Sequence, residues 1–172
     1  MSESLKTWLF RLGFNLWPCY RGTGARVTHI ASDWSEVRVT LPASLWTRNY
    51  VGTIFGGSMY AAVDPFYMIM LMKLLGPGYL VWDKAATIRF KKPGRSRLFA
   101  TFRLPPGEEA AIHGALEHER SADRTYSVEL VDREGTVHAS VEKVVYVRRG
   151  DQASPPAHPD VPGAGERAGA DR

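Results

Sequence analysis

The sequence predicts an α+β domain in which an antiparallel sheet wraps around one long buried helix, with an extra helix at the N-terminus. The segment 54–75 is apolar on nearly every side, as a helix enclosed by protein must be. Six shorter segments, two before this helix and four after it, are rich in β-branched and aromatic residues. A helix buried on all sides needs a sheet that curls around it, which predicts the wrapped architecture.

Length and composition fit one globular domain with tails. The chain has 172 residues, of which 44% are hydrophobic and 11% aromatic, too many for a disordered protein. The 23% of charged residues argues equally against an integral membrane protein. The net charge of +4 would help to attract polyanions such as nucleic acid, anionic lipid or phosphate-bearing molecules, without choosing among them.

Cysteine and histidine usage predicts neither a disulfide nor a metal site. Cys19 is the single cysteine, and no cluster of Cys and His has the spacing of metal ligands. We therefore expect no metal and no organic cofactor. Glu3 and Arg11 interrupt what could otherwise be an export signal, and no small-residue cleavage site follows, so we expect a cytoplasmic protein.

The N-terminal part, residues 1–24, should be an amphipathic helix over 4–16 followed by a linker. Apolar residues recur there at helical spacing. Two interpretations stay open, a helix packed on the edge of the domain and a helix lying on a membrane surface with Lys6 and Arg11. The apolar residues are Leu5, Trp8, Leu9, Leu12 and Leu16.

The main domain is expected over 25–149. A hairpin of strands at 27–30 and 37–41 opens it, and strands at 80–90, 98–104, 126–131 and 137–147 follow the long helix. A short exposed helix is expected within 107–120. Residues 150–172 are rich in Pro, Ala, Gly, Asp and Arg without periodicity, which predicts a disordered tail.

The long apolar segment could also be read as a membrane span. Asp64 lies near its middle beside the helix-disrupting Pro65, and an isolated carboxylate in lipid would be costly. We therefore prefer a buried core helix and expect no transmembrane segment.

Two glycines lie where the long helix starts. The first N–H groups of a helix have no partner within it, and at Gly56 and Gly57 a ligand can approach these groups closely. Such amides, helped by the positive end of the helix dipole, can stabilise the negative charge that develops on a carbonyl oxygen. The alternative is close helix packing.

Asp64 is the second candidate for chemistry. It follows Gly57 by seven residues, about two helical turns, so it falls on roughly the same face as the glycines. A carboxylate in a buried helix could be a general base or a nucleophile. Because proline follows it, Asp64 could instead cap a second helix over 65–75.

Two further groups of residues could bind a ligand. Lys91, Lys92 and Arg95 surround a Pro-Gly turn, where their charges could meet phosphates or simply keep the turn solvated. Met68 and its neighbouring methionines give the long helix an adaptable apolar surface, suited to an apolar ligand or to filling the core.

The residues Asn49, Gly52, Gly56, Gly57 and Asp64 resemble the motif of the hotdog acyl-CoA thioesterases of the phenylacetate-degradation type. In that motif an Asn is followed by His-Gly-Gly and, one helix face later, by Asp. The resemblance extends over about 27–147, including the strand and turn at 88–94 and the hairpin at 132–146. It is greatest to a branch without an assigned function, which carries Asn-Tyr, Phe-Gly-Gly and Asp-Pro at these places.

The resemblance implies a hotdog domain that works as a homodimer or a dimer of dimers on an acyl-CoA or acyl-carrier thioester. The Gly57 amide would polarise the thioester carbonyl, and Asp64, acting across the dimer interface, would activate water or attack directly. Asn49 would orient substrate or water. Phe55 stands where the thioesterases have His, so one polar contact to the acyl group or water is missing.

The remaining residues around the motif would contact the substrate. These are Tyr50, Phe55, Gly56, Met68, Lys91, Lys92 and Arg95. Our first hypothesis is therefore a thioesterase, and the alternative is a non-catalytic binder of acyl thioesters or fatty acids. Dehydration of a hydroxyacyl thioester ranks lower because that chemistry pairs an acid with a His that this motif lacks. Nucleic acid is not an expected partner, since the basic residues form no recognisable module.

Overall fold

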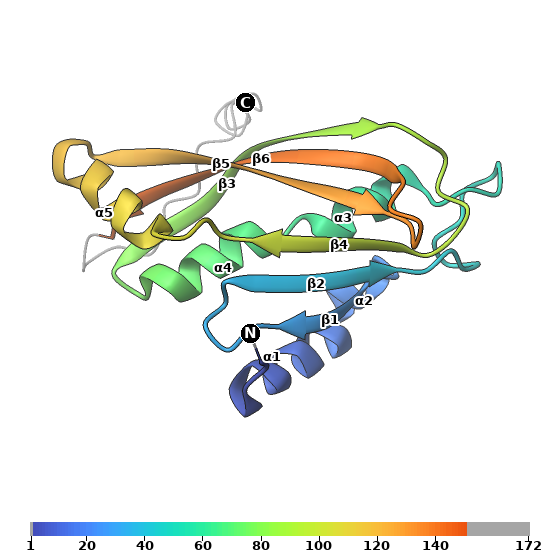
Figure 1. Cartoon of the computed structure of the whole chain (residues 1–172), viewed down its shortest axis with the longest axis horizontal. Helices are drawn as coiled ribbons and strands as arrows, with labels where there is room; N and C mark the ends of the chain where they lie inside the picture. Colours follow the sequence, from blue (N-terminus) through green and yellow to red (C-terminus); the bar gives the residue numbers. More distant parts are fainter. Residues whose placement is uncertain (1, 151–172) are drawn as a thin grey trace, which may run out of the picture.

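The computed structural model describes residues 2–150, which form a six-stranded antiparallel sheet curled over a central helical segment (Figure 1). The strand order is β1-β2-β4-β5-β6-β3. The predicted α+β architecture is confirmed. Apart from Gly150, the predicted disordered tail lies outside the described residues. The strands are β1 Arg26–Ile30, β2 Glu36–Leu41, β3 Tyr79–Phe90, β4 Leu98–Arg103, β5 Ser121–Val131 and β6 Val137–Arg149.

The helices differ from the sequence prediction in two places. The predicted long helix is divided into α3 and α4, and a short helix, α2, follows the N-terminal one where we expected a linker. A Pro at the first position of α2 starts a new helical turn instead of ending the structure. The helices are α1 Leu5–Leu16, α2 Pro18–Gly22, α3 Gly56–Val63, α4 Phe66–Leu75 and α5 Glu108–His118.

The central helical segment breaks at Pro65, which has no N–H to donate to the preceding turn. Side chains from elsewhere bind carbonyls next to the break. Tyr20 donates its hydroxyl to the carbonyl of Ala62 at 3.1 Å, and Lys143 donates to the carbonyl of Asp64. Asp64 does not cap α4, whose N-cap position is Pro65, without a side-chain hydrogen bond. The capping interpretation of Asp64 is therefore not what the structure shows.

The core lies between the concave face of the sheet and the central helices. Phe66 of α4 contacts Phe102 of β4, with ring centroids 4.9 Å apart, and Tyr67 stacks on Tyr126 of β5 at 4.6 Å. Among the described residues, Gly56–Leu75 is the one stretch long and apolar enough to cross a membrane, and 44% of it is buried inside the protein. The core helix of a soluble protein meets the same criterion.

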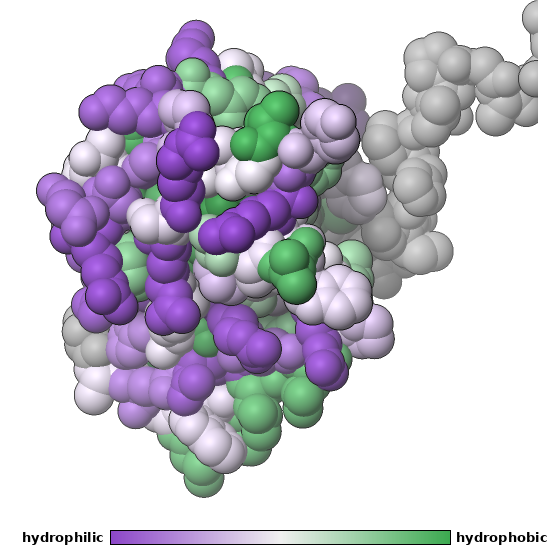
Figure 2. Space-filling view, turned by 90° about the vertical axis from the view of Figure 1, so that its right-hand side faces the viewer, coloured by the Kyte–Doolittle hydropathy of each residue, from purple (hydrophilic) through white to green (hydrophobic). Residues whose placement is uncertain are grey.

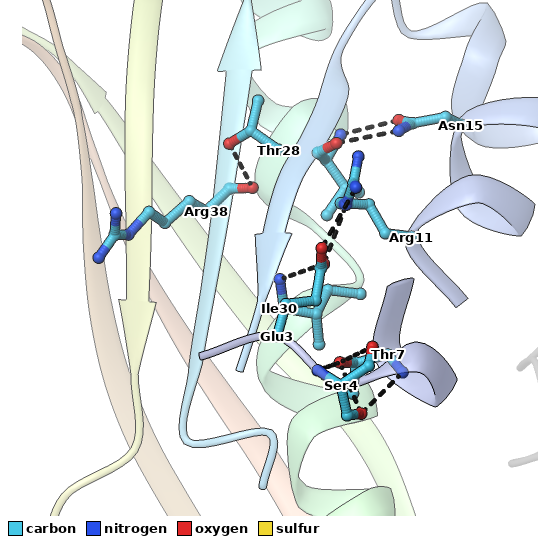
Figure 3. Close-up of polar contacts among 9 residues, drawn as sticks. Glu3, Ser4, Thr7, Arg11, Asn15, Thr28, Ile30 and Arg38 are labelled. Atoms are coloured by element: carbon cyan, nitrogen blue, oxygen red, sulfur yellow. Dashed lines mark hydrogen bonds and ion pairs between the residues drawn. The ribbon is translucent and has the colours of Figure 1, made fainter. Parts of the chain in front are cut away.

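The two edges of the sheet differ in whether other groups bind their backbone. At β1, polar side chains of α1 and of the residues just before it bind the backbone of the edge strand (Figure 3). Asn15 accepts the N–H of Val27 at 2.8 Å and donates to its carbonyl at 2.9 Å, while Glu3 accepts the N–H of Ile30 at 3.3 Å. At the other edge, β3 pairs with β6, and no described residue pairs with its outer side. An unpaired edge of this length favours pairing with another strand.

A partly buried ion pair joins α5 to the sheet. Arg124 of β5 donates to both carboxylate oxygens of Glu108, at 2.8 and 2.9 Å, and Tyr126 donates its hydroxyl to the same carboxylate. Burial raises the pKa of Glu108, but the hydrogen bonds from Arg124 and Tyr126 outweigh it, so the net pKa lies below the usual 4.5. The ionised carboxylate is the form that the fold stabilises.

We predict that Glu108→Gln lowers the free energy of unfolding by about 2 kcal/mol at neutral pH, because it weakens charge-assisted hydrogen bonds. Because the folded-state pKa is lowered, this contribution is full above the unfolded-state pKa and is lost as the pH falls through the folded-state value. Urea unfolding between neutral and acidic pH should show the two proteins converging in acid. Glu109→Gln, on the exposed neighbour in the same helical turn, is the control and should change little.

Candidate active site

The loop that leads into α3 is fixed by Asn49. Its side-chain oxygen accepts the N–H groups of Val51 and Thr53, at 3.2 and 3.1 Å, and its amide nitrogen donates to the Thr53 hydroxyl at 3.0 Å. The N–H of Ile54 then donates to the carbonyl of Gly94 at 2.8 Å, which joins the loop to the turn after β3. Both the oxygen and the nitrogen of the Asn49 side-chain amide thus stabilise the conformation of the loop.

The start of α3 lacks a side-chain cap. Phe55 occupies the N-cap position and makes no side-chain hydrogen bond, so no side chain satisfies the first N–H groups of the helix. Aromatic rings lie against both glycines. A Cβ on Gly56 would come within 2.8 Å of the Phe90 ring, and one on Gly57 within 2.3 Å of the Phe55 ring. A side chain at either position would therefore have to displace an aromatic ring, and both rings are more than half exposed.

A hollow of about 380 Å³ lies beside this helix start. It brings together four of the residues expected in the site, Asn49, Gly56, Lys91 and Lys92. Gly57 does not line it. The other lining residues are Thr53, Ile54, Met59, Phe90, Pro93 and Gly94.

The basic turn beside the hollow is held by His138. The N–H groups of Lys91 and Lys92 donate to the His138 carbonyl at 2.8 and 3.2 Å, and the His138 ring contacts the carbonyl of Pro93 at 3.1 Å. The other ring nitrogen lies 2.9 Å from Asp132, and hydrogen bonding to His138 is the main cause that lowers the pKa of that carboxyl. Backbone hydrogen bonds therefore fix the positions of the two lysines. Both side chains are exposed, and the Lys91 ammonium lies 3.9 Å from the Glu129 carboxylate.

Asp64 lies at the end of α3 in a second cluster of polar residues. The Lys143 ammonium lies 2.8 Å from Asp64 Oδ1 and 2.7 Å from Asp83 Oδ2. The Lys143 side chain is completely buried, whereas that of Asp64 is 43% exposed. One cation from β6 thus holds two carboxylates, one of which reaches solvent.

The second carboxylate, Asp83 of β3, has an unusual environment. Burial raises its pKa, Lys143 lowers it, and the nearby charge of Asp64 raises it again, with a net increase. Its Oδ1 atom is buried and has no hydrogen-bond partner in the described chain. Tyr60 of α3 lies in the same cluster, where burial and hydrogen bonding to Asp64 raise the pKa of its hydroxyl.

Sequence reasoning missed Lys143, although a signal was present. Alternate residues of β6 face the core, and Lys143 falls in the same register as Val141, Val145 and Val147, which are all buried. A lysine is almost never fully buried without a partner, so this position should have suggested carboxylates facing it.

The two clusters lie apart on one chain. Asp64 follows Gly56 by eight residues, which places them about 12 Å apart along a helix axis, and Asp64 does not line the hollow. A carbonyl group held at the glycines could not also contact the Asp64 carboxylate of the same chain. The described chain therefore carries two separate clusters, the hollow beside the uncapped start of α3 and the lysine-bound carboxylate.

The remaining expected residues lie outside both clusters. Tyr50 projects fully into solvent, Phe55 is more than half exposed, and Arg95 is exposed in the basic turn. Met68 is partly buried and packs against the core. Among residues 2–150 there is no group of three or more His, Cys, Asp or Glu side chains that could hold a metal ion.

The fold defines the class of protein. An antiparallel sheet curled over a central helix with a glycine-rich start is the hotdog fold, and solved structures of that fold match the chain. The sequence matches the domain of unknown function DUF4442 over residues 6–147, and the chain belongs to that family. No curated protein matches it.

Similar solved structures come from several bacteria. A Pseudomonas aeruginosa protein of unknown function, described as "Probable Thioesterase", has a TM-score of 0.74 at 18% identity, with 87% of this chain and 100% of that chain covered. A Chlorobaculum tepidum protein of unknown function has a TM-score of 0.66 at 14% identity, covering 84% and 95%. A Haemophilus influenzae thioesterase has a TM-score of 0.62 at 12% identity, covering 87% and 93%. At these identities the likeness shows the fold.

We predict that Lys143→Met lowers the free energy of unfolding by about 3 kcal/mol, because it leaves the carboxylates of Asp64 and Asp83, the latter largely buried, without their shared counter-charge. Urea denaturation measures the loss. Adding Asp83→Asn should recover part of it, since the remaining carboxylate is half exposed.

The matched control is Lys84→Met, which removes an exposed ion pair with Asp123 on the same sheet. That change should cost less than about 1 kcal/mol. Equal losses for the two lysines would show that Lys143 does not hold the carboxylates together.

Proposed function

We propose that the protein is a thioesterase that hydrolyses an acyl-CoA or acyl-carrier thioester at a site shared by two subunits. The observation that carries the proposal is the Asp64 carboxylate, held on one side by buried Lys143 and open to solvent on the other. A fixed carboxylate with an accessible face can activate a water molecule or attack directly. Similar solved structures described as thioesterases support the choice of reaction.

A homodimer formed through β3 would complete the site. Among the described residues the outer edge of β3 is unpaired, and several large apolar side chains are exposed on or near it. A two-fold axis between two β3 strands would set the central helices side by side in opposite directions. The helix start of one subunit then approaches Asp64 of the other. The site can form between subunits even though the two groups lie about 12 Å apart within one chain. The exposed apolar residues are Trp82 and Phe90 on β3, and Tyr50, Val51 and Phe55 in the segment that leads into α3.

The hollow at α3 and the Asp64 carboxylate together supply the groups needed for hydrolysis. The thioester carbonyl oxygen accepts a hydrogen bond from the uncapped amide at the start of α3. We favour the Gly56 amide over that of Gly57, because Gly56 lines the hollow and the Phe55 ring lies against Gly57. Asp64 removes a proton from a water molecule while the oxygen of that water attacks the carbonyl carbon. The tetrahedral intermediate collapses, the C–S bond breaks, and the thiolate leaves and takes up a proton.

The basic turn is suited to the carrier part of the substrate. Lys91 and Lys92 line the hollow and Arg95 follows them in the same exposed turn. Their charges can pair with the phosphates of coenzyme A or of a carrier-protein arm. The single exposed thiol, Cys19, suits a reducing cytoplasm, where such substrates occur.

A non-catalytic binder of acyl thioesters or fatty acids is the second candidate. The observation that favours it is the pair of rings, Phe55 and Phe90, at the two glycines, which gives the helix start apolar walls and no polar side chain. A site of this kind would retain an acyl group without supplying a second polar contact for water.

We predict that wild type releases free thiol from at least one member of a panel of short, medium, long and aromatic acyl-CoAs. Asp64→Asn should lower this rate by about 100-fold or more, because an amide cannot act as a general base. The substitution keeps an oxygen that Lys143 can bind, so urea unfolding should stay near the wild-type value.

Two results would contradict this assignment. Full activity of Asp64→Asn would remove Asp64 from the chemistry. Tight retention of an acyl-CoA by wild type without any thiol release would establish the binder.

We predict that Gly56→Pro abolishes thiol release whereas Gly56→Ala retains most of it. Gly56 is the first helical residue, a position that tolerates proline, and Phe55 before it is already extended (ψ 132°). Proline removes the N–H that would bind the carbonyl oxygen. Alanine adds the same Cβ against the Phe90 ring but keeps the N–H, so it isolates the role of the amide.

Mixed subunits test whether the site is shared. If it is, equimolar Asp64→Asn and Gly56→Pro chains, unfolded and refolded together, should recover about a quarter of the wild-type rate, because each mixed dimer contains one intact site. A site confined to one chain would give no recovery.

A further inference from the structure

Helix α1 presents its apolar face to solvent. Hydrophobic side chains gather at the lower end of the molecule in Figure 2, where Figure 1 places α1. These side chains lie on one face of the helix, since their positions recur at intervals of three and four residues. The large apolar residues of α1 and its C-cap, each between 42% and 75% exposed, are Leu5, Trp8, Leu9, Leu12, Leu16 and Trp17.

The opposite face of α1 fastens the helix to the sheet with polar groups. Arg11 donates to both carboxylate oxygens of Glu3, at 2.9 and 3.2 Å, and Glu3 and Asn15 bind the backbone of β1 (Figure 3). Phe10 and Phe14 add packing against the core. A helix on the surface of a soluble domain usually turns its apolar face inward, so the outward apolar stripe needs a partner.

The charges around this face identify the partner. Residues 2–26 contain four basic residues and one acidic residue, a large part of the formal net charge of +4. The acidic residue, Glu3, is already paired with Arg11, while Lys6, Arg21 and Arg26 are exposed. A stripe of Leu and Trp with basic residues around it is the composition of helices that lie in the interface of an anionic membrane.

The shape of this surface also fits a lipid layer. Helix α1 forms the end of the molecule and not the floor of a cleft, so its side chains can enter a flat surface. An apolar hollow of about 490 Å³ beside it is lined by Leu9, Phe10, Gly13, Phe14 and Trp17. Tryptophan places an apolar ring and an N–H donor at the boundary between lipid chains and water.

We propose that α1 is an interfacial helix that docks the protein on an anionic phospholipid surface, with its Leu/Trp face buried in the outer part of the lipid layer. The strand order places β1, which α1 covers, and β3 at opposite edges of the sheet. Docking therefore leaves β3 and the hollow at α3 accessible. The proposal stands without the thioesterase assignment, because it uses none of the residues of that site.

The experiment is sedimentation of the full-length protein with vesicles of phosphatidylcholine alone or with about one third phosphatidylglycerol. Wild type should bind the anionic vesicles, and binding should weaken at high salt. Leu9→Gln/Leu12→Gln should weaken binding about tenfold or more, because it removes apolar area without changing charge. Ala110→Gln/Ala111→Gln, on exposed positions of α5, is the matched control and should bind like wild type.

Two outcomes would overturn the proposal. Wild type could remain in the supernatant with both kinds of vesicle, or the Leu9→Gln/Leu12→Gln pair could bind as well as wild type. In the first case, light scattering could also show a larger assembly that the same leucine pair reduces. That result would assign the α1 face to contact between copies of this chain.

Discussion

The buried Lys143 ammonium is the interaction on which the centre of the molecule depends. It joins three segments far apart in sequence, because it contacts the carboxylate and the carbonyl of Asp64 and the carboxylate of Asp83. The carbonyl contact supports the helix break that Pro65 imposes. Without this cation, the polar groups at the break would lie near the core with no compensating charge. The helix break and the carboxylate therefore depend on the same side chain.

A second constraint is the asymmetry of the sheet edges. Side chains of the same chain bind the backbone of the β1 edge, whereas no strand among the described residues pairs with the outer side of β3. One edge of the sheet is thus covered within the chain, and the other is open to pairing with a further strand. The apolar residues exposed near β3 and those exposed on α1 form two separate groups, which suggests two different partners.

The strands and the core helix could be predicted because burial imposes a period of two or an all-round apolar surface. The confirmed sheet follows from that pattern. The start of α2 was missed because Pro18 both ends one helix and begins another. The sequence offers the division of the central helix only as an alternative, since a break at Pro65 depends on Tyr20 and Lys143, which are distant in sequence.

The candidate site was predicted in part. The sequence identified Asp64, the glycines and the basic turn because each is unusual in its own segment. It could not show that Asn49 binds its own loop or that Gly56 rather than Gly57 lines the hollow, since both depend on the local path of the backbone. Nor could it show that Asp83 shares a cation with Asp64, because that contact is made between β3, β6 and the central helix.

The cover that Asn15 and Glu3 give to β1 also bears on how the chain avoids misassembly. Without Glu3 and α1, the N–H groups of Val27 and Ile30 would be open on a strand whose alternate residues are apolar. Such a strand is a template for intermolecular β-pairing and aggregation. Proteolytic loss of the N-terminal segment would then favour aggregation. The same segment would shield the β1 edge from intermolecular pairing during folding.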